Sequence, residues 1–248
     1  MNGYERVRIE NIMVHGDTTR TFVFDHDFEP KPGQFGMVFM SGVDEKPFSF
    51  SMKNAMTVKK RGPFTEKLFE FEEGDHLLVR GPYGKGIFPQ GRYAVFGGGC
   101  GAAPLYLMTQ SEGYDIRLAV VAGATKGSIP FIDEWPNAVV FTEDGSAGRK
   151  GVITDFDFGS LPDTSYAVCG PEPMMAKVAR MIGRPHETHL SLERRMKCGR
   201  GGCGECSISG YSVCVDGPVF RYAQVLDMPH FNRCGRAQNG ELKPIGQF

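Results

Sequence analysis

The sequence predicts an N-terminal antiparallel β-barrel, a parallel-sheet α/β domain and a small C-terminal module. Three observations support this. Short strand-like segments separated by turns fill the first ninety residues, strands and helices alternate from about residue 92, and a glycine-rich segment beyond residue 190 holds four cysteines. Evenly spaced short strands are typical of a barrel, and strand–helix alternation of a doubly wound sheet. We therefore expect domains over residues 1–90, 91–190 and 191–248.

Composition excludes several classes of protein. The chain has 248 residues, of which 41% are hydrophobic and 23% charged, as in ordinary soluble proteins. Its net charge of −1 favours neither nucleic acid nor an anionic membrane. No apolar stretch approaches the roughly 18 residues that span a bilayer, and the N-terminus lacks a signal-peptide pattern. We expect a cytoplasmic protein that binds neither nucleic acid nor membrane.

The barrel is predicted from six strand-like segments. Turn signals separate them, among them Lys31–Gly33 and Gly81–Gly84, and one helical turn is expected over residues 66–71. The segments are Tyr4–Met13, Thr19–Phe24, Gln34–Met40, Phe48–Met52, Ala55–Lys60 and Asp75–Gly81.

The α/β domain is predicted from four apolar strands and two helices that alternate along the chain. The helices are expected over Ala102–Ser111 and Pro173–Ile182. The strands are expected over Arg92–Phe96, Ile116–Ala122, Ala138–Thr142 and Tyr166–Cys169. Beyond residue 190 we expect a glycine-rich coil.

Four of the seven cysteines follow the spacing C-x4-C-x2-C-x7-C, at Cys198, Cys203, Cys206 and Cys214. Plant-type ferredoxin sites begin with C-x4-C-x2-C and end with a more distant cysteine, so the spacing favours a 2Fe–2S cluster that passes electrons. The glycines between the ligands permit the sharp turns that such a loop needs. The alternative is a structural zinc site of four thiolates, although such sites usually pair two C-x2-C knuckles.

Two glycine-containing turns indicate a nucleotide site. Gly97–Gly101 ends one strand and opens a helix, and Cys169-Gly170-Pro171 ends another and does the same. Both turns should lie at the carboxyl edge of one parallel sheet, where ligands bind. A plain tight turn is the alternative for the first. For Cys169 the choice is between a neighbour of a nicotinamide ring and a buried small hydrophobe. Thr142–Ser146 should lie at the same edge, as a ligand contact or a solvated acidic turn.

A flavin site is predicted in the barrel. Lys46-Pro47-Phe48-Ser49 combines a cation, a rigid turn, an aromatic face and a hydroxyl, which together suit a flavin dinucleotide. Arg61–Thr65 would open a helix that receives the phosphates. Each segment taken singly is more often plain structure.

The order of these motifs resembles the electron-transfer subunits of the two-subunit, NAD-dependent dihydroorotate dehydrogenases, in the ferredoxin-reductase superfamily. The resemblance covers residues 4–226. It is most specific over Leu190–Gly199, which reads Leu-Ser-Leu-Glu-Arg-Arg-Met-Lys-Cys-Gly, over Gly202–Cys206, and over Cys214–Phe220 with its Asp-Gly-Pro-Val-Phe ending.

The resemblance implies three cofactors: FAD, a 2Fe–2S cluster and NAD. The family's Arg-Pro-x-Ser motif falls on Lys46, Pro47, Phe48 and Ser49, its flavin-contacting strand on Thr57, Val58 and Lys59, and its Gly-Thr phosphate pair on Phe64 and Thr65. NAD would be held by Gly98, Gly99, Gly101, Cys169, Gly170 and Pro171. Lys46 replaces an arginine, Phe64 replaces a glycine, and the interval from Cys206 to Cys214 is short for the family. A shorter hairpin would explain that interval.

The resemblance also implies a partner. A catalytic subunit with FMN would oxidise dihydroorotate to orotate, in the pathway to UMP, and electrons would cross the cluster and FAD to NAD+. We expect a heterotetramer with two copies of each subunit. The nearest alternative is an electron-transfer subunit of a hydrogenase, a sulfide dehydrogenase or a ferredoxin:NADP oxidoreductase.

Overall fold

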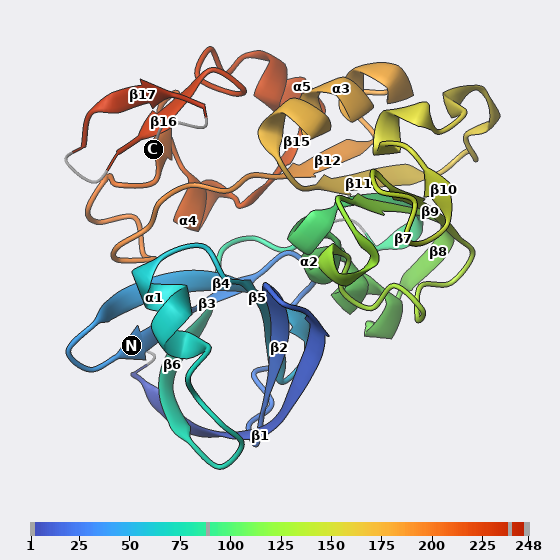
Figure 1. Ribbon diagram of the computed structural model, residues 1–248. Helices are drawn as coiled ribbons and strands as arrows, with labels where there is room; N and C mark the ends of the chain where they lie inside the picture. Colours follow the sequence, from blue (N-terminus) through green and yellow to red (C-terminus); the bar gives the residue numbers. More distant parts are fainter. Residues whose placement is uncertain (1–2, 88–89, 238–239, 246–248) are drawn as a thin grey trace.

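The first part of the chain closes into a six-stranded antiparallel barrel (Figure 1). The computed structural model describes residues 3–87, 90–237 and 240–245. Each barrel strand overlaps a predicted one, and helix α1 (Pro63–Leu68) begins just before the predicted helical turn. In spatial order the strands are β1 (Glu5–Gly16), β2 (Thr19–Phe24), β5 (Ala55–Lys59), β4 (Asp44–Met52), β3 (Phe35–Met40) and β6 (His76–Tyr83).

The barrel follows from alternating side chains. On β1, Val7 and Ile9 are fully buried, whereas Arg6 and Arg8, which alternate with them, are exposed. A strand directs successive side chains to opposite faces, so this alternation places one row inside the barrel and the other in water. Leu68 of α1 packs into the same core, so the helix covers part of the barrel.

The second part of the chain forms a seven-stranded sheet whose strand order reverses between β7 and β11. Doubly wound sheets bind ligands at such a reversal, outside the carboxyl ends of the strands. The spatial order is β10 (Arg149–Lys150), β9 (Ala138–Thr142), β8 (Tyr114–Gly123), β7 (Gly91–Gly98), β11 (Ser165–Cys169), β12 (Thr188–Ser191) and β15 (Val219–Arg221).

Helices cover both faces of this sheet. Helix α3 (Glu172–Ile182) packs in one apolar core with Phe96, and α2 (Ala102–Tyr106) packs in the other core with Val95. Since neighbouring residues of β7 point to opposite faces, the two helices lie on opposite sides, and the predicted doubly wound architecture is confirmed. The predicted helix at 102–111 is shorter. Its remainder is the 3-10 turn η2 (Leu107–Gln110), and another, η1 (Gly99–Gly101), precedes it. Further 3-10 turns are η3 (Lys126–Ser128), η4 (Ile153–Asp155) and η5 (Phe158–Ser160).

Beyond residue 190 the predicted coil is confirmed for residues 192–206, which hold three of the four cysteines and contain no helix or strand, but the prediction is wrong for the described residues from 207 onward. Strand β12 lies beside β11, and β15 pairs antiparallel with β12 as the edge of the sheet. Each helix or strand that the sequence did not predict here is too short for its hydrophobic residues to form a recognisable repeating pattern. The remaining elements are β13 (Ser207–Ile208), β14 (Tyr211–Ser212), α4 (Val213–Asp216), α5 (Tyr222–Leu226), β16 (Cys234–Arg236) and β17 (Leu242–Pro244).

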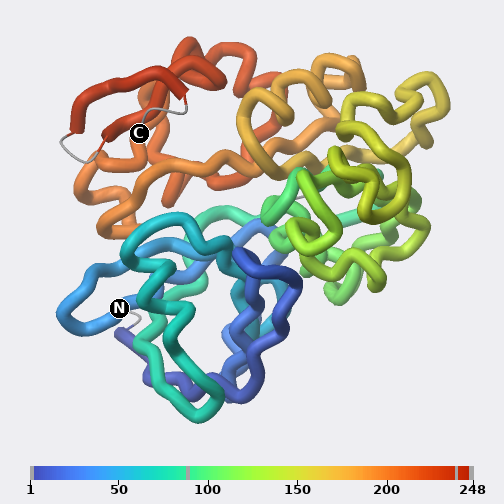
Figure 2. The backbone as a smooth tube through the Cα atoms, viewed as in Figure 1, coloured from blue at the N-terminus to red at the C-terminus, as the bar shows by residue number. Residues whose placement is uncertain are grey.

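The cysteine-bearing loop lies beside the barrel, as the orange segment next to the blue and cyan strands shows (Figures 1 and 2). The Lys85 backbone N–H donates to the Gly217 carbonyl oxygen at 2.5 Å, which joins the end of the barrel to the C-terminal module. Among the helices of the described residues, none is long and apolar enough to cross a membrane.

Candidate cofactor and metal sites

A tight hairpin explains the short interval between Cys206 and Cys214. Strands β13 and β14 pair directly after Cys206, with only Ser209 and Gly210 between them. Both turn residues have positive φ, 47° and 91°, as the type I′ turn of a two-residue hairpin requires. The hairpin returns the chain so that the Cys214 N–H donates to the Cys206 sulfur at 3.4 Å.

The four predicted ligands gather as two pairs of thiols. Cys206 and Cys214 are buried and adjacent, whereas Cys198 is half-buried and bonds with the exposed Cys203. The Gly201 N–H donates to the Cys214 sulfur at 3.2 Å, which links the two halves of the loop. Two iron atoms need two thiolates each, so the pairing suits a two-iron cluster. Within the described ranges, no three cysteine, histidine or acidic side chains converge as ligands of a single metal ion.

Glycine conformation lets the loop fold around its thiols. Gly201 has a φ of +78°, and a Cβ there would lie 2.9 Å from the Val215 Cγ2 atom. Gly199 and Gly204 also have positive φ. Gly202, which we expected to be required for the same reason, has an ordinary φ and open space around it. Only glycine enters the left-handed region freely, so three of the four glycines are needed for this path.

Hydrogen bonds set the acidity of the thiols. Burial acts to raise the pKa of Cys198, yet donors that include the Arg200 N–H outweigh burial and lower this pKa to about 7. For Cys214, burial and the neighbouring Cys206 thiol raise the pKa to about 12. Iron binds the thiolate form of cysteine. The positive charge of bound iron would therefore stabilise the ionised forms of Cys206 and Cys214, which the protein alone does not. The donor set and the glycine cradle fit a cluster.

The two glycine-containing turns meet at the strand reversal. Gly97 of β7 pairs with Cys169 of β11. A Cβ on Gly101 would lie 2.7 Å from the carbonyl carbon and oxygen of Cys169 and from the Gly170 Cα. A Cβ on Gly98 would lie 2.9 Å from the Met174 Cε atom. The turns are therefore in backbone contact at the edge where the sequence predicts NAD, with Pro171 beside Gly98.

Replacing Gly101 with alanine tests this contact. Its φ is not in the left-handed region, so the methyl group acts by collision with the Cys169–Gly170 backbone alone. We expect a loss of about 1–3 kcal/mol in unfolding free energy. We also expect the KM for NADH to rise about tenfold or more. The added methyl group must push the two turns apart, and these turns are the predicted binding site. Steady-state dye reduction measures the KM. Gly3→Ala, with no atom within 4 Å of its Cβ, is the control. An unchanged KM in Gly101→Ala would contradict the placement of NAD.

Two thiols and one carboxylate lie together beside these turns. Cys169 is buried, and burial raises its pKa to about 12, with a further contribution from Glu193. Burial likewise raises the pKa of Cys100 to about 12, and its thiol donates to the Thr57 carbonyl oxygen at 3.9 Å. Both thiols are thus neutral at physiological pH. We had not predicted Cys100 or Glu193 as site residues. Cys100 lies inside the glycine run, which was the available signal.

The predicted flavin residues lie on two neighbouring strands and on α1. Lys46, Pro47, Phe48 and Ser49 are half-buried on β4, and Lys46 forms an ion pair with Asp44. The ring of Phe48 stacks on that of Phe64, with centroids 5.9 Å apart. Phe64, which stands where the family has glycine, therefore packs against Phe48 of the Lys46–Ser49 motif.

Two hydroxyls of the predicted flavin set have partners within the protein. The Thr65 hydroxyl accepts from the N–H groups of Arg61 and Gly62 at 2.7 and 3.1 Å, so it caps its own loop. The Thr57 hydroxyl bonds with Thr21 at 2.7 Å and with Ser51 at 2.9 Å in a buried chain. Val58 is buried and Lys59 exposed. Thr57 therefore contacts the glycine run through its backbone carbonyl, which accepts from Cys100, while its hydroxyl bonds within the barrel.

The acidic turn after β9 lies at the same sheet edge and satisfies its own polar groups. The Asp144 carboxylate accepts from the Ser146 N–H at 2.9 Å, and the Ser146 hydroxyl accepts from the Lys126 N–H at 2.7 Å. The turn is thus ordered by a hydrogen bond within it and by one from Lys126.

Comparison with solved structures defines the class of protein. A structure described as an NADH-dependent reduced ferredoxin–NADP oxidoreductase superposes with a TM-score of 0.75 at 27% identity, covering 93% of this chain and 95% of its own. A flavohemoglobin-like FAD/NAD-binding domain from Vibrio cholerae shares the fold alone, with a TM-score of 0.62 at 18% identity, covering 77% and 98%. The chain therefore has a ferredoxin-reductase-like fold, and its similarity to the first of these structures indicates an oxidoreductase.

Sequence comparison then identifies the family. The model of the iron–sulfur cluster binding domain of dihydroorotate dehydrogenase B matches residues 193–226. A probable dihydroorotate dehydrogenase B (NAD(+)) electron transfer subunit of Thermococcus kodakarensis is 42% identical, covering 91% of this chain and 99% of the relative. One from Methanocaldococcus jannaschii is 39% identical, covering 94% and 96%. The chain belongs to the family of dihydroorotate dehydrogenase B electron transfer subunits.

The predicted family and oxidoreductase class are thereby confirmed. The predicted cofactor set of FAD, a 2Fe–2S cluster and NAD is the one that this family and fold support. An electron transfer subunit implies a separate catalytic subunit as its partner.

Proposed function

We propose that this chain carries electrons from a catalytic subunit that oxidises dihydroorotate, through a 2Fe–2S cluster and FAD, to NAD+. Dihydroorotate loses two electrons and two protons to become orotate, NAD+ takes up a hydride, and one proton is released. FAD, when bound, connects the two-electron chemistry of the nicotinamide with the one-electron chemistry of the cluster. The orotate formed would serve pyrimidine synthesis in the cytoplasm.

We assign one cofactor to each predicted domain. The barrel at 1–90 would hold FAD through β4, β5 and the start of α1. The sheet at 91–190 would hold NAD at Gly98, Gly99, Gly101 and the Cys169–Pro171 turn, with Cys169 as a neutral neighbour of the nicotinamide. The module at 191–248 would hold the cluster on Cys198, Cys203, Cys206 and Cys214.

The observation that carries this proposal is that the three sites are contiguous. The Cys100 thiol of the glycine turn contacts the Thr57 carbonyl on a predicted flavin strand. The Cys198 carbonyl of the cluster loop accepts a hydrogen bond from the Arg80 side chain of the barrel at 2.9 Å. The barrel therefore touches both other sites directly. The described residues contain a six-stranded barrel and a seven-stranded sheet but no barrel of eight βα units, so we place dihydroorotate oxidation on the partner.

Co-expression with a dihydroorotate-oxidising, FMN-containing subunit tests the function. The two chains should purify together, and the complex should form orotate with NAD+ at a rate that neither chain reaches alone. Light scattering should give the mass of two copies of each. Failure of the two chains to form a pair would contradict the proposal. If only ferredoxin, sulfide or hydrogen serves as the electron donor, the chain would instead be the electron-transfer subunit of a ferredoxin:NADP oxidoreductase, a sulfide dehydrogenase or a hydrogenase.

The visible spectrum and metal content test the cofactors separately. We expect flavin bands above broad cluster absorbance, with two irons and one FAD per chain. A colourless protein with stoichiometric zinc would show that the thiols form a structural site. Adding NADH should bleach both chromophores, which establishes the relay without the partner.

A further inference from the structure

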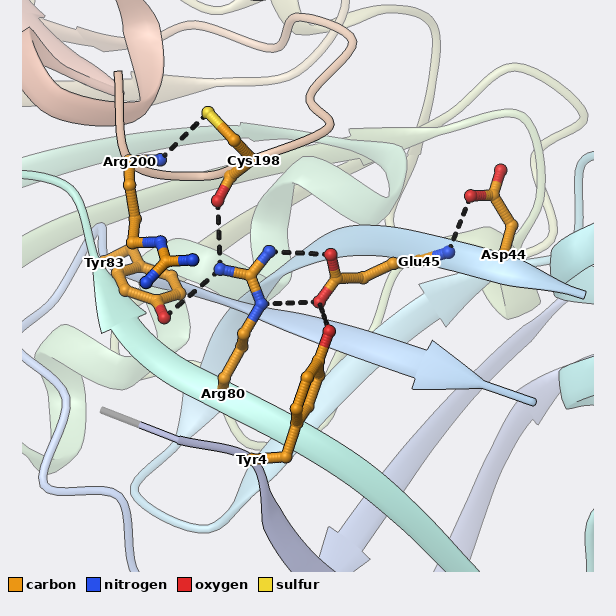
Figure 3. A network of polar contacts seen from close by, with 7 residues as sticks. All are labelled: Tyr4, Asp44, Glu45, Arg80, Tyr83, Cys198 and Arg200. Carbon is orange, nitrogen blue, oxygen red and sulfur yellow. Dashed lines mark hydrogen bonds and ion pairs between the residues drawn. The ribbon is translucent and has the colours of Figure 1, made fainter. Parts of the chain in front are cut away.

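A buried arginine of the barrel holds the backbone of the first cluster cysteine. Arg80 lies on β6 and is only 6% exposed. Its Nη1 atom donates to the Cys198 carbonyl oxygen at 2.9 Å. Figure 3 shows the guanidinium between the cluster loop and the barrel strands. The bond spans 118 positions of sequence, so it is a tertiary link between the barrel and the cluster loop.

The guanidinium is fixed from several sides. Its Nε and Nη2 atoms donate to the two carboxylate oxygens of Glu45, each at 2.6 Å, in a bidentate pair (Figure 3). Nη1 also donates to the Tyr83 hydroxyl at 3.3 Å, and the rings of Tyr83 and Tyr4 lie 5.4 and 5.7 Å from the guanidinium carbon. The Tyr4 hydroxyl donates to Glu45 at 2.8 Å. A lysine at this position could not make both the bidentate pair with Glu45 and the hydrogen bond to the Cys198 carbonyl, because its ammonium group is compact and lacks the planar array of donors of a guanidinium.

The loop is seated on the barrel at the same place. A Cβ on Gly199 would lie 3.1 Å from the Met37 Cγ atom and 3.5 Å from the Tyr83 Cδ2 atom. The residue after Cys198 therefore packs closely on β3 and β6, while Arg80 holds the carbonyl before it. Glu45, which orients Arg80, directly precedes Lys46 on the predicted flavin strand.

We propose that Arg80 is a positioning residue for electron transfer: together with Glu45 it fixes the cluster loop to the flavin strand and sets the charge next to the first cluster ligand. This rests on the proposed assignment of FAD and the cluster. A fixed separation keeps the rate of transfer between the two cofactors high, because small displacements of reacting groups cost large factors in rate. Hydrogen bonds and net charge around a cluster set its reduction potential.

The charges predict opposite effects for the two partners. Arg80→Gln removes a buried positive charge that contacts the cluster loop, so the midpoint potential of the cluster should fall. Glu45→Gln leaves Arg80 charged and uncompensated, so the potential should rise. Arg80→Lys keeps the charge but loses the fork, so it should restore most of the potential while the transfer stays slow. A role in folding alone would move all three variants in one direction.

The experiment uses the full chain loaded with FAD and cluster, and NADH as the electron donor. Redox titration followed by electron paramagnetic resonance gives the midpoint potential and the g-values, and stopped-flow absorbance gives the FAD-to-cluster rate. We expect shifted g-values and about tenfold slower cluster reduction in Arg80→Gln, with the rate of FAD reduction unchanged. Arg8→Gln is the control, since Arg8 is an exposed barrel residue that pairs with Glu10 and Asp25.

Wild-type g-values, potential and rate in Arg80→Gln would overturn the proposal, as would shifts of the same sign in Arg80→Gln and Glu45→Gln. If Arg80→Gln fails to retain its cluster, the comparison of Arg80→Lys with Glu45→Gln still gives the sign and the rate. Because only NADH and this chain are used, a failure of the dihydroorotate partner to bind would not affect the result.

Discussion

Replacing Cys214 with serine should abolish the cluster and reduce dihydroorotate-to-NAD+ electron transfer by more than about 100-fold, since even changes outside the ligand shell of a metal often cost 10–100-fold. Cys214 is buried, and its sulfur accepts from the Gly201 N–H beside Cys206. A serine hydroxyl does not ionise near neutral pH, so the second iron would keep one thiolate. The cluster absorbance and its paramagnetic signal should disappear.

The same variant should keep its flavin activity. The predicted FAD residues lie on the barrel, whereas Cys214 lies in the C-terminal module, so NADH-driven reduction of a dye that accepts electrons from FAD should stay near the wild-type rate. Cys234→Ser is the matched control, because Cys234 lies on β16 outside the ligand spacing. Retention of a full cluster in Cys214→Ser, or loss of it in Cys234→Ser, would show that the ligand set is wrong.

Local signals in the sequence predicted most of the fold. The barrel strands were predictable because turn signals separate short strand-like segments at even spacing, and on β1 buried and exposed residues also alternate, as at Val7 and Ile9. The apolar strands of the sheet were recognisable for their β-branched residues and for the glycine turns that follow them. The shared edge of the two glycine-containing turns followed from the rule that parallel strands end on one side of a sheet, and the pairing of Gly97 with Cys169 confirms it.

The C-terminal module was less predictable because its elements depend on contacts made far along the chain. Strand β15 is three residues long and exists by pairing with β12. No local pattern in Val219–Arg221 indicates that partner. The gathering of the four thiols was predictable from their ferredoxin-type spacing, and the tight hairpin from the short interval that ends at Cys214.

Contacts between the predicted sites could not be predicted from the sequence. Thr57 and Thr65 were assigned as flavin contacts by position, but their hydroxyls bond within the protein, at Ser51 and at the loop before α1. Arg80 carried one weak signal, a charged residue directly after the apolar run Leu77–Val79. Its partners, Glu45 and the Cys198 carbonyl, lie 35 and 118 positions away, and only the folded chain brings them together.

The buried ion pair between Arg194 and Glu172 should have the largest effect on stability. Their side chains are 4% and 6% exposed. Arg194 also donates to the Glu193 carbonyl at 2.7 Å, and Glu172 accepts from the Asn232 N–H at 2.7 Å, so the pair joins α3, the lead-in to the cluster and the C-terminal segment. Arg194→Met leaves the Glu172 carboxylate buried without its cation. We expect a loss of about 3–5 kcal/mol in unfolding free energy.

For a chain of this size, the loss corresponds to a melting temperature about 10 °C lower, measurable by calorimetry on the cofactor-loaded protein. The double variant Glu172→Met/Arg194→Met should recover most of it, because removing both charges also removes their desolvation cost. Arg117→Met, which breaks an exposed pair with Asp115, should change stability by less than about 1 kcal/mol. A double variant no more stable than Arg194→Met would mean that side-chain packing at this site outweighs the penalty of the buried unpaired charge.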